Sequence, residues 1–230
     1  MPATGADLPI DQLLASRPDL WRGRRRPTIP VLGSGRADLN DWLPAGGWPC
    51  GRLVELLPER FGLGELDMLL PALAEQTRQG LPVLFASPPL VPCPQYLAQA
   101  GLALERLIIV RKTDQALWAA EQGLKSGLCG AIVLWHPPGR VQPRAIRRLQ
   151  LAAENGSAPV FVCYRAGQQP PPSLSALRVQ IRPGPELIML RGDCHDNRHD
   201  NRRDNRDRHR LHLGRGNVIA FRPKTGKDRQ

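Results

Sequence analysis

The sequence predicts an α/β protein whose mostly parallel central sheet is covered by helices on both faces. Short segments that are uniformly apolar recur along the chain, as strands buried on both faces require. Segments with the apolar spacing of amphipathic helices separate them, which is typical of strand and helix alternation around a parallel sheet. A length of 230 residues and a hydrophobic content of 41% fit one globular core with tails.

The predicted elements follow one another at short intervals. A glycine-rich turn at 45–49 leads into a first strand at 52–57, and apolar residues recur on one helical face over 65–78, with a helix end near Gly80. Further strands are expected at 82–86, 107–110, 131–135 and 159–164, and further helices at 94–100, 116–126 and 144–154. Segments 177–181 and 186–190 flank Pro183-Gly184-Pro185 and predict a terminal antiparallel hairpin, at which we expect the sheet to end.

Composition divides the chain into three parts: an N-terminal arm (1–30), a core domain (31–192) and a tail (193–230). Residues 191–230 repeat an Asp-Asn-Arg unit and hold twelve Lys and Arg against six Asp, so over half of the net charge of +11 lies there. Low complexity predicts that this basic tail is disordered. The excess of positive charge favours a polyanionic partner such as DNA.

Cysteine spacing and apolar runs limit the functional classes. The five cysteines form no C-x-x-C pair, so we expect neither a zinc site nor a disulfide framework, and no metal site elsewhere. His195 and His199 have helical ligand spacing in the tail but no predicted ordered support. With neither a signal peptide nor a membrane-spanning run in the sequence, we expect a cytoplasmic location.

The segment 57–66 lies between the first strand and the first long helix, where a phosphate-binding loop would lie. A functional loop of the type G-x-x-x-x-G-K-[ST] uses backbone amides, a lysine and a hydroxyl to hold phosphates and magnesium. The preceding Gly-Gly-Trp-Pro and Gly-Arg-Leu-Val-Glu segments and this loop resemble the RecA nucleotide loop, G-P-E-S-S-G-K-T. Pro58, Glu59 and Gly62 match that motif, whereas Leu63 and Gly64 stand at the lysine and hydroxyl positions.

Other positions of the RecA pattern have also lost the polar residue that the family places there. No carboxylate follows the second strand in Ala86-Ser87-Pro88-Pro89, and the strand expected to end in an aspartate ends in Trp135-His136. Tyr164 stands where the family places a glutamine. The resemblance therefore implies a degenerate ATPase fold with no catalytic residue and no bound cofactor, because this chemistry is almost wholly electrostatic.

Within the RecA-like group the chain most resembles the ImuA family over about residues 14–192. The motifs are Asp-Leu-Trp-Arg-Gly-Arg (19–24), Gly-Gly-Trp-Pro (46–49), Gly-Glu-Leu (64–66), Leu-Leu-Pro-Ala-Leu (69–73), Leu-Trp-Ala-Ala-Glu-Gln (117–122) and Arg-Arg-Leu-Gln-Leu-Ala-Ala-Glu (147–154). The resemblance implies an accessory protein of mutagenic translesion DNA synthesis in the SOS response. Its implied partners are an ImuB-type Y-family-like protein and an error-prone DnaE-type polymerase, with RecA a further candidate.

Three groups of residues are candidates for contact with DNA or a protein partner. Trp21 lies beside an arginine cluster in the arm, and the predicted helix 144–154 places three arginines on one face, which a simple solvated surface also explains. The tail arginines would attach to DNA through counterion release. The candidates are Trp21, Arg24, Arg25, Arg26, Arg144, Arg147, Arg148, Arg198, Arg202, Arg203 and Arg206.

Two other functions remain open at this point. A SulA-like inhibitor of cell division shares RecA-like ancestry and a damage-inducible setting, but would act on FtsZ. An active RecA-like ATPase would have to work without the lysine, the hydroxyl and the carboxylates of its family. The ImuA-type motifs favour the scaffold function over both.

Overall fold

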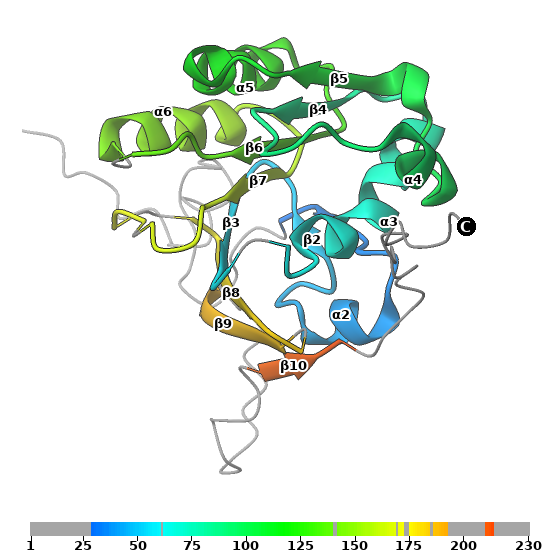
Figure 1. The fold of residues 1–230 in the computed structure, drawn as a ribbon, viewed down its shortest axis with the longest axis vertical. Helices are drawn as coiled ribbons and strands as arrows, with labels where there is room; N and C mark the ends of the chain where they lie inside the picture. Colours follow the sequence, from blue (N-terminus) through cyan, green and yellow to red (C-terminus); the bar gives the residue numbers. More distant parts are fainter. Residues whose placement is uncertain are drawn as a thin grey trace, which may run out of the picture.

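A computed structural model of the chain describes residues 29–60, 62–139, 142–168, 170–172, 175–184, 186–192 and 210–213. An eight-stranded sheet forms its centre, in the order β10-β9-β8-β3-β7-β6-β4-β5 (Figure 1). The strands are β3 (Leu53–Pro58), β4 (Val83–Ala86), β5 (Leu107–Val110), β6 (Ala131–Trp135), β7 (Val160–Cys163), β8 (Leu177–Arg182), β9 (Glu186–Gly192) and β10 (Arg210–His212). Pairing is parallel from β8 to β5 and antiparallel at β8-β9 and β9-β10, so the predicted fold class is confirmed.

Helices cover both faces of the parallel part of the sheet. Figure 1 shows α5 and α6 together on one side and α3 and α4 on the other. The described helices are α2 (Ala37–Trp42), α3 (Glu65–Arg78), α4 (Pro94–Gln99), α5 (Ala116–Ser126) and α6 (Pro143–Glu154), with short 3-10 turns at Leu104–Arg106 and Thr113–Gln115. The predicted helix at 65–78 ends as expected, because Gly80 has a φ of 81°, the left-handed conformation that glycine adopts without strain.

Successive residues of each inner strand point to opposite faces of the sheet and pack into two separate hydrophobic cores. In β6, Ile132 packs with α5 and α6, whereas its neighbour Val133 packs with α3 and α4. Both side chains are fully buried. This alternation within a uniformly apolar strand is why such strands need helices on both faces.

A small sheet that the sequence did not indicate lies beside the α3 core. Its two strands, β1 (Val31–Leu32) and β2 (Trp48–Pro49), pair antiparallel. Trp48 is fully buried and meets Phe161 of β7 edge-on at 5.3 Å between ring centroids. A Cβ on Gly47 would lie 2.6 Å from the carbonyl oxygen of Leu32, so the glycine before the tryptophan permits this close pairing. The Gly-Gly-Trp-Pro motif thus packs the small sheet against β7 of the main sheet.

One expectation about the end of the sheet was wrong. Arg210–His212 forms β10, which pairs with β9 and extends the sheet beyond the predicted hairpin. Leu213 is buried in the α3 core, and Leu211 packs against the same core. Two apolar residues separated by one polar residue suffice to bury one face of an edge strand. The rest of the tail, 193–209 and 214–230, lies outside the described residues.

Candidate functional site at the carboxyl edge of the sheet

The loop between β3 and α3 leaves the sheet beside β8. Pro58 is the last residue of β3 and is buried, not part of the loop itself. The backbone N–H of Glu59 donates to the carbonyl of Ile181 at 2.9 Å. The Glu59 carboxylate accepts from Arg182 Nε at 2.7 Å and from Gln180 Nε2 at 3.1 Å. Side chains of β8 therefore fix the start of the loop.

The second half of the loop bends sharply into α3. Gly62 and Gly64 have φ values of 78° and 86°, so both adopt the left-handed conformation. Gly64 is the N-cap residue of α3 and supplies no side-chain cap. Instead, the carboxylate of Glu65, which is only 7% exposed, accepts a hydrogen bond from the backbone N–H of Leu63 at 3.1 Å. An internal carboxylate thus binds an amide of the segment where a phosphate would be cradled.

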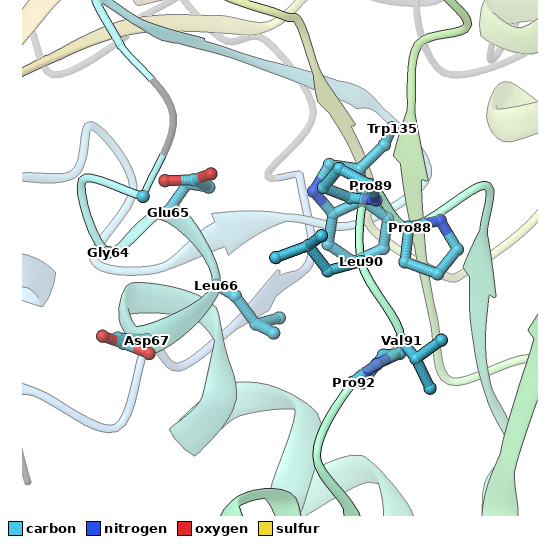
Figure 2. A pocket seen from close by; sticks show the side chains of 11 residues that line it. Gly64, Glu65, Leu66, Asp67, Pro88, Pro89, Leu90, Val91, Pro92 and Trp135 are labelled. Atoms are coloured by element: carbon cyan, nitrogen blue, oxygen red, sulfur yellow. The ribbon is translucent and has the colours of Figure 1, made fainter. Parts of the chain in front are cut away.

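A hollow of about 240 Å³ lies next to this loop, where the carboxyl ends of β3, β4 and β6 meet. Figure 2 shows Leu66 extending from the first turn of α3 toward the proline-rich segment 88–92 that follows β4. Leu90 and Val91 of that segment are 67% and 65% exposed. The lining residues are Gly62, Gly64, Glu65, Leu66, Asp67, Pro88, Pro89, Leu90, Val91, Pro92 and Trp135.

The charges around the hollow are negative. Glu65 and Asp67 are the only ionisable residues among the described residues that line it. The hydroxyl of Tyr96 in α4 donates to Asp67, and burial together with that carboxylate raises the pKa of Tyr96. Leu63 brings no charge to the loop and Gly64 no hydroxyl. The lining therefore does not fit a nucleotide triphosphate with its magnesium ion, which needs cationic and hydroxyl groups at these positions.

Ser87 shapes the wall of the hollow, and the sequence analysis did not identify this role. It has a φ of 54°, the only positive φ of a non-glycine residue in the described chain. Its backbone N–H donates to the carbonyl of Val110 at 2.7 Å, and its hydroxyl lies 3.3 Å from that of Thr113. These contacts stabilise a conformation that costs of the order of 1 kcal/mol. The only sequence signal was the Pro88-Pro89 pair that follows.

A buried polar network joins β3, β7 and β8 on the α6 side of the sheet. Glu55 is fully buried and accepts from Tyr164 Oη at 2.8 Å, Ser175 Oγ at 2.6 Å and Arg178 Nε at 2.9 Å. Arg178 also donates to the carbonyl of Pro171 at 3.0 Å. Burial, and then the charge of Glu55, raises the pKa of Tyr164. The residue at the expected glutamine position therefore holds the sheet together.

His136 lies against this network at the carboxyl end of β6. Its ring stacks on that of Tyr164 with 5.6 Å between centroids, and its Nδ1 lies 2.8 Å from the carbonyl oxygen of Pro137. The side chain is 4% exposed, and burial lowers its pKa. Its Nε2 has no hydrogen-bond partner among the described residues. The ring is therefore best accommodated in the neutral form.

The three arginines of α6 occupy the opposite face of the sheet from the hollow. Ile146, Leu149 and Ala153 are buried beneath them, as the helical spacing predicted, and the arginines are exposed. Arg148 pairs with Glu121 of α5, which also binds Lys125 at 2.8 Å. These contacts lower the pKa of Glu121, with Lys125 the larger cause. The structure shows no ion pair between Arg144 or Arg147 and another described residue.

The remaining predicted contact residues cannot be placed. Those of the arm and tail, together with His195 and His199, lie outside the described residues: Trp21, Arg24, Arg25, Arg26, Arg198, Arg202, Arg203 and Arg206. Over the described part of the chain, no three His, Cys, Asp or Glu side chains gather as metal ligands would. In the same part, no helix has the length and hydrophobicity needed to cross a membrane.

Comparison with known proteins relates this architecture to RecA. The chain is 32% identical to RecA of Corynebacterium jeikeium over 112 residues, which are 47% of this chain and 29% of that protein. For RecA of Brevibacillus brevis and of Treponema denticola the identities are 34% and 32%, each over 109 residues and 46% of this chain. The chain spans less than a third of the length of these relatives. No model of a protein family matches it. This distant, partial similarity supports a place in the RecA-like superfamily.

Proposed function

We propose that this chain is a non-catalytic accessory protein of damage-induced translesion DNA synthesis, of the ImuA type. It would bring an ImuB-type Y-family-like protein and an error-prone DnaE-type polymerase together, with RecA filaments a further target. The similarity to RecA supports a role connected with DNA damage or recombination. The more specific proposal, a scaffold of the ImuA type in translesion synthesis, rests on the ImuA-type sequence motifs.

The observation that carries this proposal is the lining of the hollow beside the β3-α3 loop. Two carboxylates and a set of apolar side chains stand where a nucleotide phosphate would need cations. Removing a lysine and a magnesium ligand from such a site removes several kcal/mol of phosphate stabilisation, because phosphoryl transfer relies on positioning and charge neutralisation. A domain without that chemistry retains its surfaces for recognition.

The free edge of the sheet at β5 offers one such surface for a protein partner. Among the described strands, β5 pairs only with β4, and Ile108 and Ile109 on it are 48% and 38% exposed. Trp118 of α5, the helix that follows β5, is 61% exposed. An apolar edge strand with unpaired backbone groups favours docking of a partner segment.

Basic residues would add a DNA contact to this scaffold. Arg144 and Arg147 on α6 are exposed without an ion pair to a described residue, and residues 191–230 carry a local excess of +6. Such contacts would be independent of DNA sequence and weakened by salt.

Co-purification of the full-length protein with the two polymerase components tests the proposal. We expect both to be retained, and Ile108→Asp to lower the affinity for one of them at least tenfold. Leu190→Asp is the matched control, because Leu190 is 52% exposed but lies on β9, at the other end of the sheet. In calorimetry, ATP with magnesium should give no heat of binding.

Three outcomes would contradict the proposal. Failure of both components to bind would remove the scaffold role. Magnesium-dependent ATP binding with turnover to ADP would favour an ATPase. Inhibition of FtsZ polymerisation, with no effect on the polymerases, would favour a SulA-like function.

A further inference from the structure

The hollow at the carboxyl edge of the sheet has an apolar floor that the core holds in place. Trp135 belongs to the α3 core, and its ring meets that of Phe85 edge-on with 5.3 Å between centroids. Leu66 packs against the same core and extends toward segment 88–92 (Figure 2). The volume of about 240 Å³ is below the lower end, about 300 Å³, of the range typical of small-molecule pockets. The hollow therefore has room for one large side chain.

The rim of the hollow is apolar and open to solvent. Leu90 and Val91 are both more than half exposed, and neither belongs to the two hydrophobic cores of the described chain. Their segment contains three prolines, at 88, 89 and 92, whose fixed φ angles limit its motion. Ser87, just before it, is held at a φ of 54° by a hydrogen bond from its N–H to a carbonyl of β5. Exposed apolar side chains on a stiff backbone lose little conformational entropy on binding, which favours contact with another molecule.

The α3 side of the hollow is negatively charged. Glu65 and Asp67 lie in the first turn of α3 and are the only ionisable residues among the described residues of the lining. A helix N-terminus contributes about half a positive charge, which two carboxylates outweigh. Asp67 is exposed and accepts from the hydroxyl of Tyr96, and an ionised carboxylate has about four acceptor positions, so it can also accept from a guanidinium or an ammonium group. On a protein with a net charge of +11, this site favours a basic ligand.

We propose that the hollow binds a basic and apolar peptide segment of a partner protein. One large apolar side chain of the segment enters between Leu66, Leu90 and Trp135, and an arginine or lysine beside it pairs with Asp67. A single buried anchor with a charged neighbour commonly supplies most of the affinity in such a contact. This inference goes beyond the proposed function and does not depend on it, because the scaffold role places its partner on β5 and needs no ligand in the hollow.

Selection from a displayed library of random peptides tests the proposal on the full-length protein. The library is selected in parallel on the unmodified protein and on its Leu90→Asp and Leu128→Asp variants. Leu128 is the matched control, because it is 69% exposed against 67% for Leu90 and does not line the hollow. We expect peptides with a large apolar residue next to arginine or lysine to be enriched about tenfold more on the unmodified protein and on Leu128→Asp than on Leu90→Asp.

The most enriched peptide then measures the charged contact. It is labelled with fluorescein and titrated by anisotropy with the unmodified protein, Asp67→Asn and Asp41→Asn. Asp67→Asn keeps an acceptor for the Tyr96 hydroxyl and removes the charge, so we expect about fivefold weaker binding. Asp41 is exposed on α2 and does not line the hollow, so Asp41→Asn should leave the affinity unchanged. Circular dichroism of each variant verifies that it is folded.

Three results would overturn the proposal. The first is that no enriched peptide depends on Leu90, and the second is that acidic peptides are enriched equally on all three proteins, which would show binding to the basic surface alone. The third is a dimer in sedimentation velocity that Leu90→Asp abolishes, which would place a second copy of the chain in the hollow. Since neither a polymerase component nor DNA is present, none of these results bears on the scaffold role.

Discussion

Glu65 and Leu63 form the hydrogen bond that defines the β3-α3 loop, with 3.1 Å between the carboxylate Oε2 and the backbone nitrogen. The carboxylate lies in the first turn of α3, where it also interacts favourably with the helix dipole. A single buried side chain thus stabilises both the loop and the start of the helix. In this loop the Glu65 carboxylate binds a backbone amide, whereas a phosphate-binding loop would use its amides to bind the phosphate of a nucleotide.

Replacing this carboxylate should destabilise the protein. Glu65→Ala removes a charge-assisted hydrogen bond and a favourable dipole interaction, so we expect a loss of roughly 1 to 2 kcal/mol in the free energy of unfolding. Glu65→Gln keeps an acceptor oxygen and should lose less. Urea denaturation of the three proteins provides the measurement. Equal stability of Glu65→Ala and the unmodified protein would show that the bond contributes nothing.

Breaking the buried network at Glu55 should cost more. Arg178→Met removes a cationic partner of the fully buried Glu55, and we expect a loss of about 3 kcal/mol. Arg182→Met serves as the control, since its ion pair with Glu59 is more than a third exposed and should contribute less than about 1 kcal/mol. Combining Arg178→Met with Glu55→Gln should recover part of the loss. Thermal unfolding provides the measurement. Equal losses of stability in Arg178→Met and Arg182→Met would contradict this interpretation.

Acid should destabilise the fold through His136. Its pKa in the folded state is lowered from 6.5 by burial, so the unfolded chain binds a proton more readily in mildly acidic solution. The stability from this residue is therefore present above about pH 6.5 and decreases as the pH falls through the lowered folded-state value. His136→Phe can keep the stack on Tyr164 while removing the proton site. Urea denaturation between pH 7.5 and 5 should show a shallower decrease for the variant, and parallel curves would exclude His136 as the cause.

The tail should contribute to DNA binding through charge. Deleting 196–215 would also remove β10 and the buried Leu213, so a lower affinity could reflect damage to the sheet. Changing Arg198, Arg202, Arg203 and Arg206 to Gln removes four charges and leaves β10 intact. We expect a several-fold lower affinity for duplex DNA at low salt and a smaller salt dependence, measured by fluorescence anisotropy. Arg144→Gln with Arg147→Gln tests the α6 face in the same assay. Unchanged affinity in the tail variant would show that the tail does not bind DNA.

The strands and helices of the central domain could be predicted from the sequence because their signals are local. Helix spacing placed α3 at Glu65–Arg78 and α5 at Ala116–Ser126, and apolar runs placed β5 and β6. The absence of a lysine at position 63 and of a hydroxyl at position 64 was also visible directly. Each of these features depends only on residues close together in the chain.

Tertiary structure decided what depends on residues far apart. Leu211 and Leu213 lie in a low-complexity tail, and only the free edge of β9 makes a strand of that segment. The need for Gly47 follows from its approach to Leu32, and the hollow is formed where the ends of three parallel strands meet. Short strands have little intrinsic preference of their own and form where a partner edge and a core are available. Periodicity in the sequence therefore determined the elements, and packing determined the last strand and the site.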